Sequence, residues 1–291
     1  MKELEPRLVA DLGCLVGEGP IWHPREHVLY FCDIPRGRLY RYDPASEACD
    51  CVHEGRPVAA ITCQVDGSLL LFRDGGRVDV FRDGRIVDTL IERIDAEAGS
   101  RFNDVVADPH GRVFAGTMPT ADRPGRLYRI DNDLSVQRIY DNVQLPNGMG
   151  FREDMRIMYQ CESLTRTVWA FNYEERTGRL SGAYAFLEID PPARPDGLIV
   201  DAEDHVWIGL WGGYAVARYS PEGDLVEQID LPVPNVTSMA LGGPDLDRLF
   251  VTTAVGEGEL ASDVPHSGGL FETRAAHAVG RLEFPSRLGI G

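Results

Sequence analysis

The sequence predicts an all-β protein that folds as a six-bladed β-propeller, and three observations lead to that prediction. Short runs of alternating apolar residues recur along the 291 residues, separated by turn pairs such as Asp66-Gly67 and Glu222-Gly223. Patterns typical of amphipathic helices are scarce. A unit of about 45 residues repeats six times, which is the size of a propeller blade made of four short strands.

Each predicted unit opens with one landmark residue just before its innermost strand. The landmarks are Glu18, Ala59, Asn103, Asn147, Asp196 and Thr237. Subtracting their numbers gives spacings of 41 to 49 residues. We expect the landmarks to lie on turns, because Asn147-Gly148 and Asp196-Gly197 are common turn pairs.

The next strands of each unit are predicted from apolar runs in phase with the landmarks. The candidate second strands are 28–31, 68–72, 113–115, 206–209 and 249–252. The candidate third strands are 38–42, 77–81, 126–130, 167–171, 215–219 and 269–272. Six units that carry two signals in the same phase are hard to obtain by chance, and they favour a closed ring of blades.

One end of the chain is expected to close the ring by pairing with the last blade. The two candidates are Arg7–Ala10 and Arg281–Phe284. No stretch reads as an interdomain linker, so we predict a single domain over residues 1–291.

Composition argues against several classes of partner. The chain has 46 Asp and Glu against 29 Lys and Arg, and its net charge of -17 repels nucleic-acid phosphates and anionic lipids. The first residues lack the pattern of a secretory signal, and no apolar run is long enough to cross a membrane. We expect a cytoplasmic protein, a monomer or weak oligomer, that binds neither nucleic acid nor membranes.

Four landmarks carry oxygen-bearing side chains, namely Glu18, Asn103, Asn147 and Asp196. In a propeller the innermost strands all start at one end of the central channel, so these four side chains are expected to meet there. Hard divalent cations prefer carboxylate and amide oxygens. We therefore predict a metal site made by Glu18, Asn147 and Asp196, with positions left open for water and substrate.

The same cavity is expected to hold groups that bind substrate. Asn103 comes from a neighbouring blade, and Arg101 lies two residues before it, where it could donate hydrogen bonds to substrate oxygens. The alternative is that each landmark is only a turn former, although Glu18 is a poor turn residue. Asp104 and Asp108 are predicted to be turn or surface residues.

Seven short motifs, spread from the first unit to the last, carry a family resemblance. They are Gly17–Pro20 with Trp22, Arg101–Asp104, Leu145–Gly148, Pro195–Gly197, Leu210–Gly213, Pro234–Ser238 and Gly242–Leu246. In these motifs the chain resembles the family of senescence marker protein (regucalcin), gluconolactonase and luciferin-regenerating enzyme. The resemblance implies a six-bladed propeller with one divalent metal in the channel, an ion such as Ca, Zn, Mg, Mn or Fe(II).

The resemblance also implies an activity, the hydrolysis of sugar lactones to aldonic acids. The metal ligands of the family fall on Glu18, Asn147 and Asp196, and its substrate-contacting residues fall on Arg101 and Asn103. Its proposed general base falls on Asp196. The metal would polarise the lactone carbonyl, and Asp196 or a water that it contacts would provide the base.

Two departures from the family pattern bear on the substrate. Some members have a longer loop after the Gly-Thr-Met motif that brings an acidic residue to the substrate; here the segment 116–124 is short and Asp122 is the nearest stand-in. Glu162-Ser163 stands where many members have Asp-Ser. Two other functions stay open: a phosphotriesterase-type hydrolase on the same fold, and a non-catalytic calcium-binding regulator.

Overall fold

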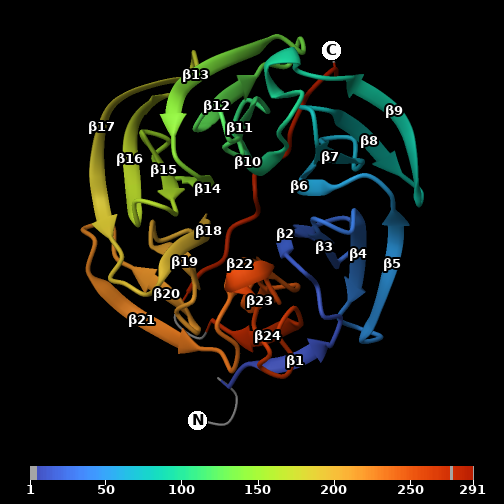
Figure 1. Ribbon diagram of the computed structural model, residues 1–291, viewed down its shortest axis with the longest axis vertical. Helices are drawn as coiled ribbons and strands as arrows, with labels where there is room; N and C mark the ends of the chain where they lie inside the picture. Colours follow the sequence, from blue (N-terminus) through green and yellow to red (C-terminus); the bar gives the residue numbers. More distant parts are fainter. Residues whose placement is uncertain (1–4, 276–277, 291) are drawn as a thin grey trace.

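The computed structural model describes residues 5–275 and 278–290, and within them it shows six four-stranded antiparallel sheets arranged as a ring (Figure 1). The innermost strands surround a central channel, and the outermost strands form the rim of the ring. The prediction of a six-bladed β-propeller is therefore confirmed. The single domain over residues 1–291 stays a prediction, and residues 1–4, 276–277 and 291 lie outside the described residues.

Strands follow one another from the channel outward in every blade but the last. Blade 1 contains β2 (Gly17–His23), β3 (Val28–Asp33), β4 (Arg38–Asp43) and β5 (Ala48–Glu54). Blade 2 contains β6 (Val58–Cys63), β7 (Leu69–Arg73), β8 (Val78–Arg82) and β9 (Arg85–Ile91). Blade 3 contains β10 (Phe102–Ala107), β11 (Val113–Thr117), β12 (Gly125–Ile130) and β13 (Val136–Val143).

The second half of the chain builds the other three blades. Blade 4 contains β14 (Pro146–Phe151), β15 (Ile157–Glu162), β16 (Thr167–Glu174) and β17 (Arg179–Glu188). Blade 5 contains β18 (Arg194–Val200), β19 (Val206–Trp211), β20 (Ala215–Tyr219) and β21 (Leu225–Asp230). Blade 6 contains β22 (Val236–Gly242), β23 (Arg248–Thr253), β24 (Leu270–Arg274) and β1 (Arg7–Ala10). Two short 3-10 helices, η2 (Asp95–Glu97) and η3 (Gly258–Leu260), lie in connecting loops.

The ring closes with the first strand of the chain. β1 pairs antiparallel with β24, with Arg7 opposite Glu272 and Leu8 opposite Phe271. Of the two candidates, the N-terminal one is therefore right. Residues 281–284 form no strand, and the expectation that they might close the ring is wrong.

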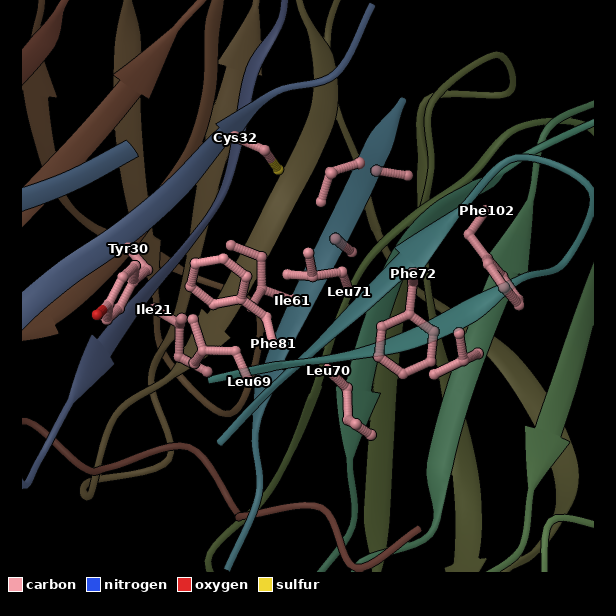
Figure 2. Packing of buried hydrophobic residues seen from close by; sticks show 14 of the residues in the cluster. Ile21, Tyr30, Cys32, Ile61, Leu69, Leu70, Leu71, Phe72, Phe81 and Phe102 are labelled. Atoms are coloured by element: carbon pink, nitrogen blue, oxygen red, sulfur yellow. The ribbon is translucent and has the colours of Figure 1, made fainter. Parts of the chain in front are cut away.

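The apolar core lies between the blades, because both faces of each sheet pack against neighbouring sheets. One cluster joins residues of blades 1, 2 and 3, among them Tyr30, Leu71 and Phe102 (Figure 2). The inner strands are mostly buried for the same reason; every residue of β6 and of β14 is buried. This packing holds the starts of the inner strands at fixed positions around the channel.

The C-terminal segment crosses the channel (Figure 1), and its contacts lie where the inner strands end. Its backbone contacts the turns there: Ser286 donates to Cys63 and Arg287 donates to Gly111. Arg281 donates to the carbonyl of Phe151 at 2.6 Å. Within the described residues, no helix is long and apolar enough to cross a membrane.

Candidate functional site

All five residues that the sequence analysis assigned to a site line one cavity. Its volume is about 160 Å³, and it lies at the end of the channel where the inner strands start. The five are Glu18, Arg101, Asn103, Asn147 and Asp196. They come from blades 1, 3, 4 and 5, so residues up to 178 positions apart (196 minus 18) lie together.

A β-bulge, not a turn, lies at each landmark, and four of the landmarks line the cavity, namely Glu18, Asn103, Asn147 and Asp196. The pairing of every inner strand with its neighbour shifts at the landmark, for example between Glu18 and Ile21 and between Pro195 and Leu198. A bulge inserts one extra residue and re-aims the local side chains. The expectation that the landmarks lie on turns is wrong, since all of them lie inside the strands.

The glycines after Asn147 and Asp196 serve packing. A Cβ on Gly148 would collide with the backbone nitrogen of Leu198, and one on Gly197 would collide with the Ser238 side chain. Neither glycine has a positive φ. Because the inner strands approach each other this closely, only glycine fits, and the polar residue before it is held next to its counterpart in the adjacent blade.

Glu18 and Asp196 are buried and close enough to influence each other. Only 7% of Glu18 and 5% of Asp196 is exposed. Burial raises the pKa of Glu18 well above its ordinary value, and the charges of Asp196 and Asp104 raise it further. Burial and the charge of Asp104 also raise the pKa of Asp196. No basic side chain forms an ion pair with either carboxylate in the described part of the chain.

Asn147 connects this acidic pair to blade 4. Its amide nitrogen donates to the Asp196 carboxylate and, at 3.1 Å, to Ser163 Oγ. Ser163 in turn donates to the carbonyl of Pro195 at 2.7 Å. Ser163 was not among the predicted site residues and appeared only in the pair Glu162-Ser163. Its position directly after β15 is the signal that could have placed it in the cavity.

Arg101 and Asn103 form the part of the cavity wall that blade 3 supplies. Arg101 Nη1 donates to the Phe102 carbonyl and to Asn103 Oδ1, both at 2.8 Å. Asn103 donates to the carbonyl of Pro146 at 2.9 Å. Burial lowers the pKa of Arg101, while the negative charge of Glu18 raises it. The remaining guanidinium donors of Arg101 are available to a ligand in the cavity.

Asp122 and Glu162, the acidic residues at the two departures from the family pattern, do not line the cavity. Asp122 is exposed in the short segment after β11, where its backbone N–H donates to Thr120. Glu162 is buried, and it accepts hydrogen bonds from the backbone N–H groups of Leu145 at 2.8 Å and Leu164 at 3.3 Å. Glu162 therefore shapes the loop that carries Leu145, one of the lining residues.

Asp104 and Asp108 differ from expectation in part. Asp108 is at a turn as predicted, but it is fully buried and accepts hydrogen bonds from Arg112 and Tyr173. Asp104 is neither a turn nor a surface residue: it lies in β10 and lines a cavity of about 50 Å³ deeper in the channel, together with Glu283. Burial raises the pKa of Asp104 to about 7, with the Glu283 charge contributing.

A second group of possible cation ligands lies outside the cavity. Oxygen and nitrogen atoms of Asp201, Glu203 and His205 lie within 4.8 Å of one another. Asp201, however, already accepts hydrogen bonds from Arg218 at 2.7 Å and Trp207 at 3.0 Å. The charge of the Asp201 carboxylate is thus balanced by Arg218, and we interpret the group as part of a structural ion pair.

Comparison with known proteins decides the family. A family model described as SMP-30/Gluconolactonase/LRE-like region matches residues 16–255. The chain belongs to this family. Its resemblance to the family, drawn from the motifs, is thereby confirmed.

Several relatives within the SMP-30/gluconolactonase/LRE-like family cover nearly the whole chain. Pentonolactonase XacC of Haloferax volcanii is 45% identical over 294 aligned positions, covering 97% of this chain and 98% of the relative. Regucalcin of Xenopus laevis is 30% identical, covering 88% and 90%. A solved structure described as a calcium-binding protein, regucalcin, from Agrobacterium tumefaciens aligns with a TM-score of 0.88 at 25% identity, covering 98% of each chain.

The donors in the cavity of this SMP-30/gluconolactonase/LRE-like protein fit a hard divalent cation. Two buried carboxylates without an ion-pair partner and one amide offer oxygen ligands, and a cation between them would offset the burial that opposes their ionisation. The Asn147 amide now turns its nitrogen toward Asp196. A half-turn of that amide would present its oxygen instead, because an amide carries a donor and an acceptor in nearly the same shape.

Proposed function

We propose that this protein is a metal-dependent lactonase that opens sugar lactones to aldonic acids. The observation that carries the proposal is the composition of one cavity: paired buried carboxylates and an amide face an arginine and an asparagine with hydrogen-bond donors. The 45% identity to a pentonolactonase over nearly the full length supports the same reaction class. The substrate class is a cyclic ester of a polyhydroxy acid.

Glu18, Asn147 and Asp196 are the residues that would hold the cation. When bound, it would supply Lewis-acid polarisation of the lactone carbonyl and charge stabilisation of the oxyanion. Arg101 and Asn103 would orient the ring by hydrogen bonds to its hydroxyl groups. Their direct bond to each other limits how far either side chain can move.

Asp196 would act as the general base. It would take a proton from the attacking water as the new C–O bond forms at the carbonyl carbon. Its carboxylate must be ionised for this step, and burial opposes ionisation. The ring oxygen leaves as the ester bond breaks and takes up a proton, which yields the open aldonic acid.

The test is acid release from a panel of aldonolactones by protein stripped with a chelator and then supplied with single metals. Metal-dependent hydrolysis above the spontaneous rate supports the proposal, and the best pair identifies the lactone and the metal. If the protein binds metal yet turns over no lactone, the proposal is wrong. Parallel assays with organophosphate triesters test the phosphotriesterase alternative.

A second function, non-catalytic calcium binding, is favoured by the relatives named regucalcin. It predicts tight calcium binding without hydrolysis of any lactone. Arg101 argues against it, because a site that only stores a cation gains nothing from a guanidinium beside the cation.

A further inference from the structure

Arg194 stands in blade 5 where Arg101 stands in blade 3. Arg101 lies two residues before the landmark Asn103, and Arg194 lies two residues before the landmark Asp196. Both residues sit where an inner strand begins at the cavity, and both line it. Blades 3 and 5, on either side of blade 4, therefore each supply one arginine to the cavity.

The two arginines differ in what they bind within the protein. Arg101 donates to Phe102 and Asn103. Arg194 is half-buried, and its side chain makes no hydrogen bond or ion pair with any described residue. A guanidinium has five N–H donors and cannot lose its charge in a protein. Its acceptors must therefore come from water or from a ligand.

Arg194 also marks the point where the cavity continues into a groove. A hollow of about 370 Å³ between blades 5 and 6 shares Arg194, Trp211 and Leu260 with the cavity. Leu260 belongs to η3 and is 51% exposed. The groove thus leads outward from the acidic pair, past Arg194, toward the surface.

The exposed aromatic side chain of Tyr214 lies at this groove. Tyr214, which lines it, is 46% exposed and has a φ of 57°, a conformation uncommon for residues other than glycine. Two backbone hydrogen bonds fix the turn: Tyr214 N–H donates to Pro234, and Leu231 N–H donates to Tyr214. Trp211, opposite Arg194 in the sheet, adds a second aromatic wall. The faces of such rings pack against the C–H groups of sugars, while the Tyr hydroxyl and the Trp N–H can form hydrogen bonds.

We propose that Arg194 and this groove form a subsite for the hydroxylated tail of an aldonolactone, the carbons outside its ring. The inference rests on the proposed lactonase function, which places the reacting carbonyl at Glu18 and Asp196. Arg194 precedes Asp196 by two residues, roughly 6–7 Å along an extended strand. That separation matches a lactone ring with its tail pointing outward. Arg194 donates to the tail hydroxyls, and Trp211 and Tyr214 line its path.

The test compares three lactones with the same five-membered ring and none, one or two hydroxylated carbons outside it. In Arg194→Ala we expect KM to rise about tenfold or more for the two lactones with a tail, the size expected for losing a hydrogen bond to a charged group. KM for the lactone without a tail and kcat for all three stay within about twofold. Arg194→Lys recovers part of the loss.

One further variant is a control, and another tests the aromatic wall of the groove. Arg85→Ala removes an exposed arginine on the outer strand β9 that has no ion pair among the described residues, so it makes the same change in net charge far from the cavity. It should leave every KM unchanged. Tyr214→Ala should raise KM a few-fold for the tailed lactones alone. Equal losses on all three lactones in Arg194→Ala, or no loss on any, would overturn the proposal.

A binding experiment separates failure of the subsite from failure of the lactonase function. Pentitols and hexitols have the hydroxylated tail but no lactone to hydrolyse. With metal present, they should raise the melting temperature of the wild-type protein and of Arg85→Ala, but not of Arg194→Ala. If no lactone is hydrolysed and this pattern still appears, the subsite stands and the reaction assignment fails. Absence of protection in the wild type counts against the subsite.

Discussion

At the scale of single residues, the site is defined by two buried carboxylates that form no ion pair with any described residue. Glu18 and Asp196 are as buried as core side chains, yet hydrogen bonds from Gly19 and Asn147 are their only direct partners among the described residues. Asp104 adds a third carboxylate below them. Burying unpaired charge is costly, so residues in this arrangement are typical of functional sites.

Asp196→Ala is expected to lower lactone turnover by at least about a hundredfold, the range that general acid–base groups contribute. It should also weaken metal binding, because one carboxylate ligand is lost. Arg101→Ala should instead raise mainly KM, since it removes contacts to the ring. Steady-state kinetics with metal in excess distinguish the two patterns. Wild-type turnover by Asp196→Ala would disprove the assignment of the base.

The acids in the channel predict an unusual dependence of stability on pH. The pKa of Asp104 is raised from its ordinary value of 3.8 to about 7, so between these values the folded chain holds a proton that the unfolded chain has released. The contribution of Asp104 to stability is therefore greatest below about pH 4 and is lost as the pH rises to about 7. Urea unfolding of chelator-treated protein measures it as the difference between the wild type and Asp104→Asn. The wild type should lose stability relative to this variant as the pH rises from about 4 to about 7, and a gain relative to the variant would contradict the assignment.

At the scale of strands and turns, two of the blades repeat one arrangement with different residues. Five positions after the landmark, blades 3 and 5 carry a buried aspartate, Asp108 and Asp201, that binds an arginine of its own blade. The bulge at the start of the strand aims the landmark into the channel, and the aspartate at its end fixes the following turn. Function and stability are thus assigned to opposite ends of one strand.

Asp201→Asn is expected to reduce the free energy of unfolding by about 3–5 kcal/mol, because it leaves the buried charge of Arg218 without its main partner. Lactone turnover at a temperature where the variant is folded should be unchanged. Glu203→Gln, at the half-exposed second partner of Arg218, should cost less than about 1 kcal/mol. Denaturant titrations give both values. Loss of metal binding in Asp201→Asn would instead point to a cation at Asp201, Glu203 and His205.

At the scale of the whole molecule, the ring depends on one short strand from the start of the chain. β1 supplies the outer strand of blade 6, and Leu8 packs against the core between blades 5 and 6. The first and last strands of the chain, β1 and β24, are therefore paired in one sheet, and this pairing closes the ring of six blades.

Removing residues 1–10 should lower the free energy of unfolding by about 2–4 kcal/mol, from roughly 1 kcal/mol per lost backbone hydrogen bond and the exposure of Leu8. Thermal and urea unfolding measure the change. Arg7→Ala is the matched control, because it removes only ion pairs with Glu47 and Glu272 at the surface and keeps the strand. A truncated chain as stable as the wild type would show that β1 is dispensable for closure.

The repeat in the sequence predicts the blades. It also predicts that Glu18, Asn147 and Asp196 meet, because equivalent positions of the blades lie together at one end of the channel. It does not predict the bulges, since a bulge depends on how two strands pair and Asn-Gly and Asp-Gly also form turns. Nor does it place Arg194 and Trp211 at the cavity, because a single arginine before a strand is more often at the surface. The inward direction of Asp104 depends on the same bulge as Asn103.

Among the described residues, the C-terminal segment covers the channel at the end opposite its mouth. Residues of all six inner strands surround the deeper cavity, and Glu283 and Phe284 cover it from the far side. A lactone that enters at the mouth must leave, once opened, by the way it came. The product carries a new carboxylate and departs past Glu18, Asp196 and the arginines, so its release competes with the arrival of the next substrate. Accumulated aldonate should therefore act as a competitive inhibitor, and its escape from the mouth could limit turnover when the chemical step is fast.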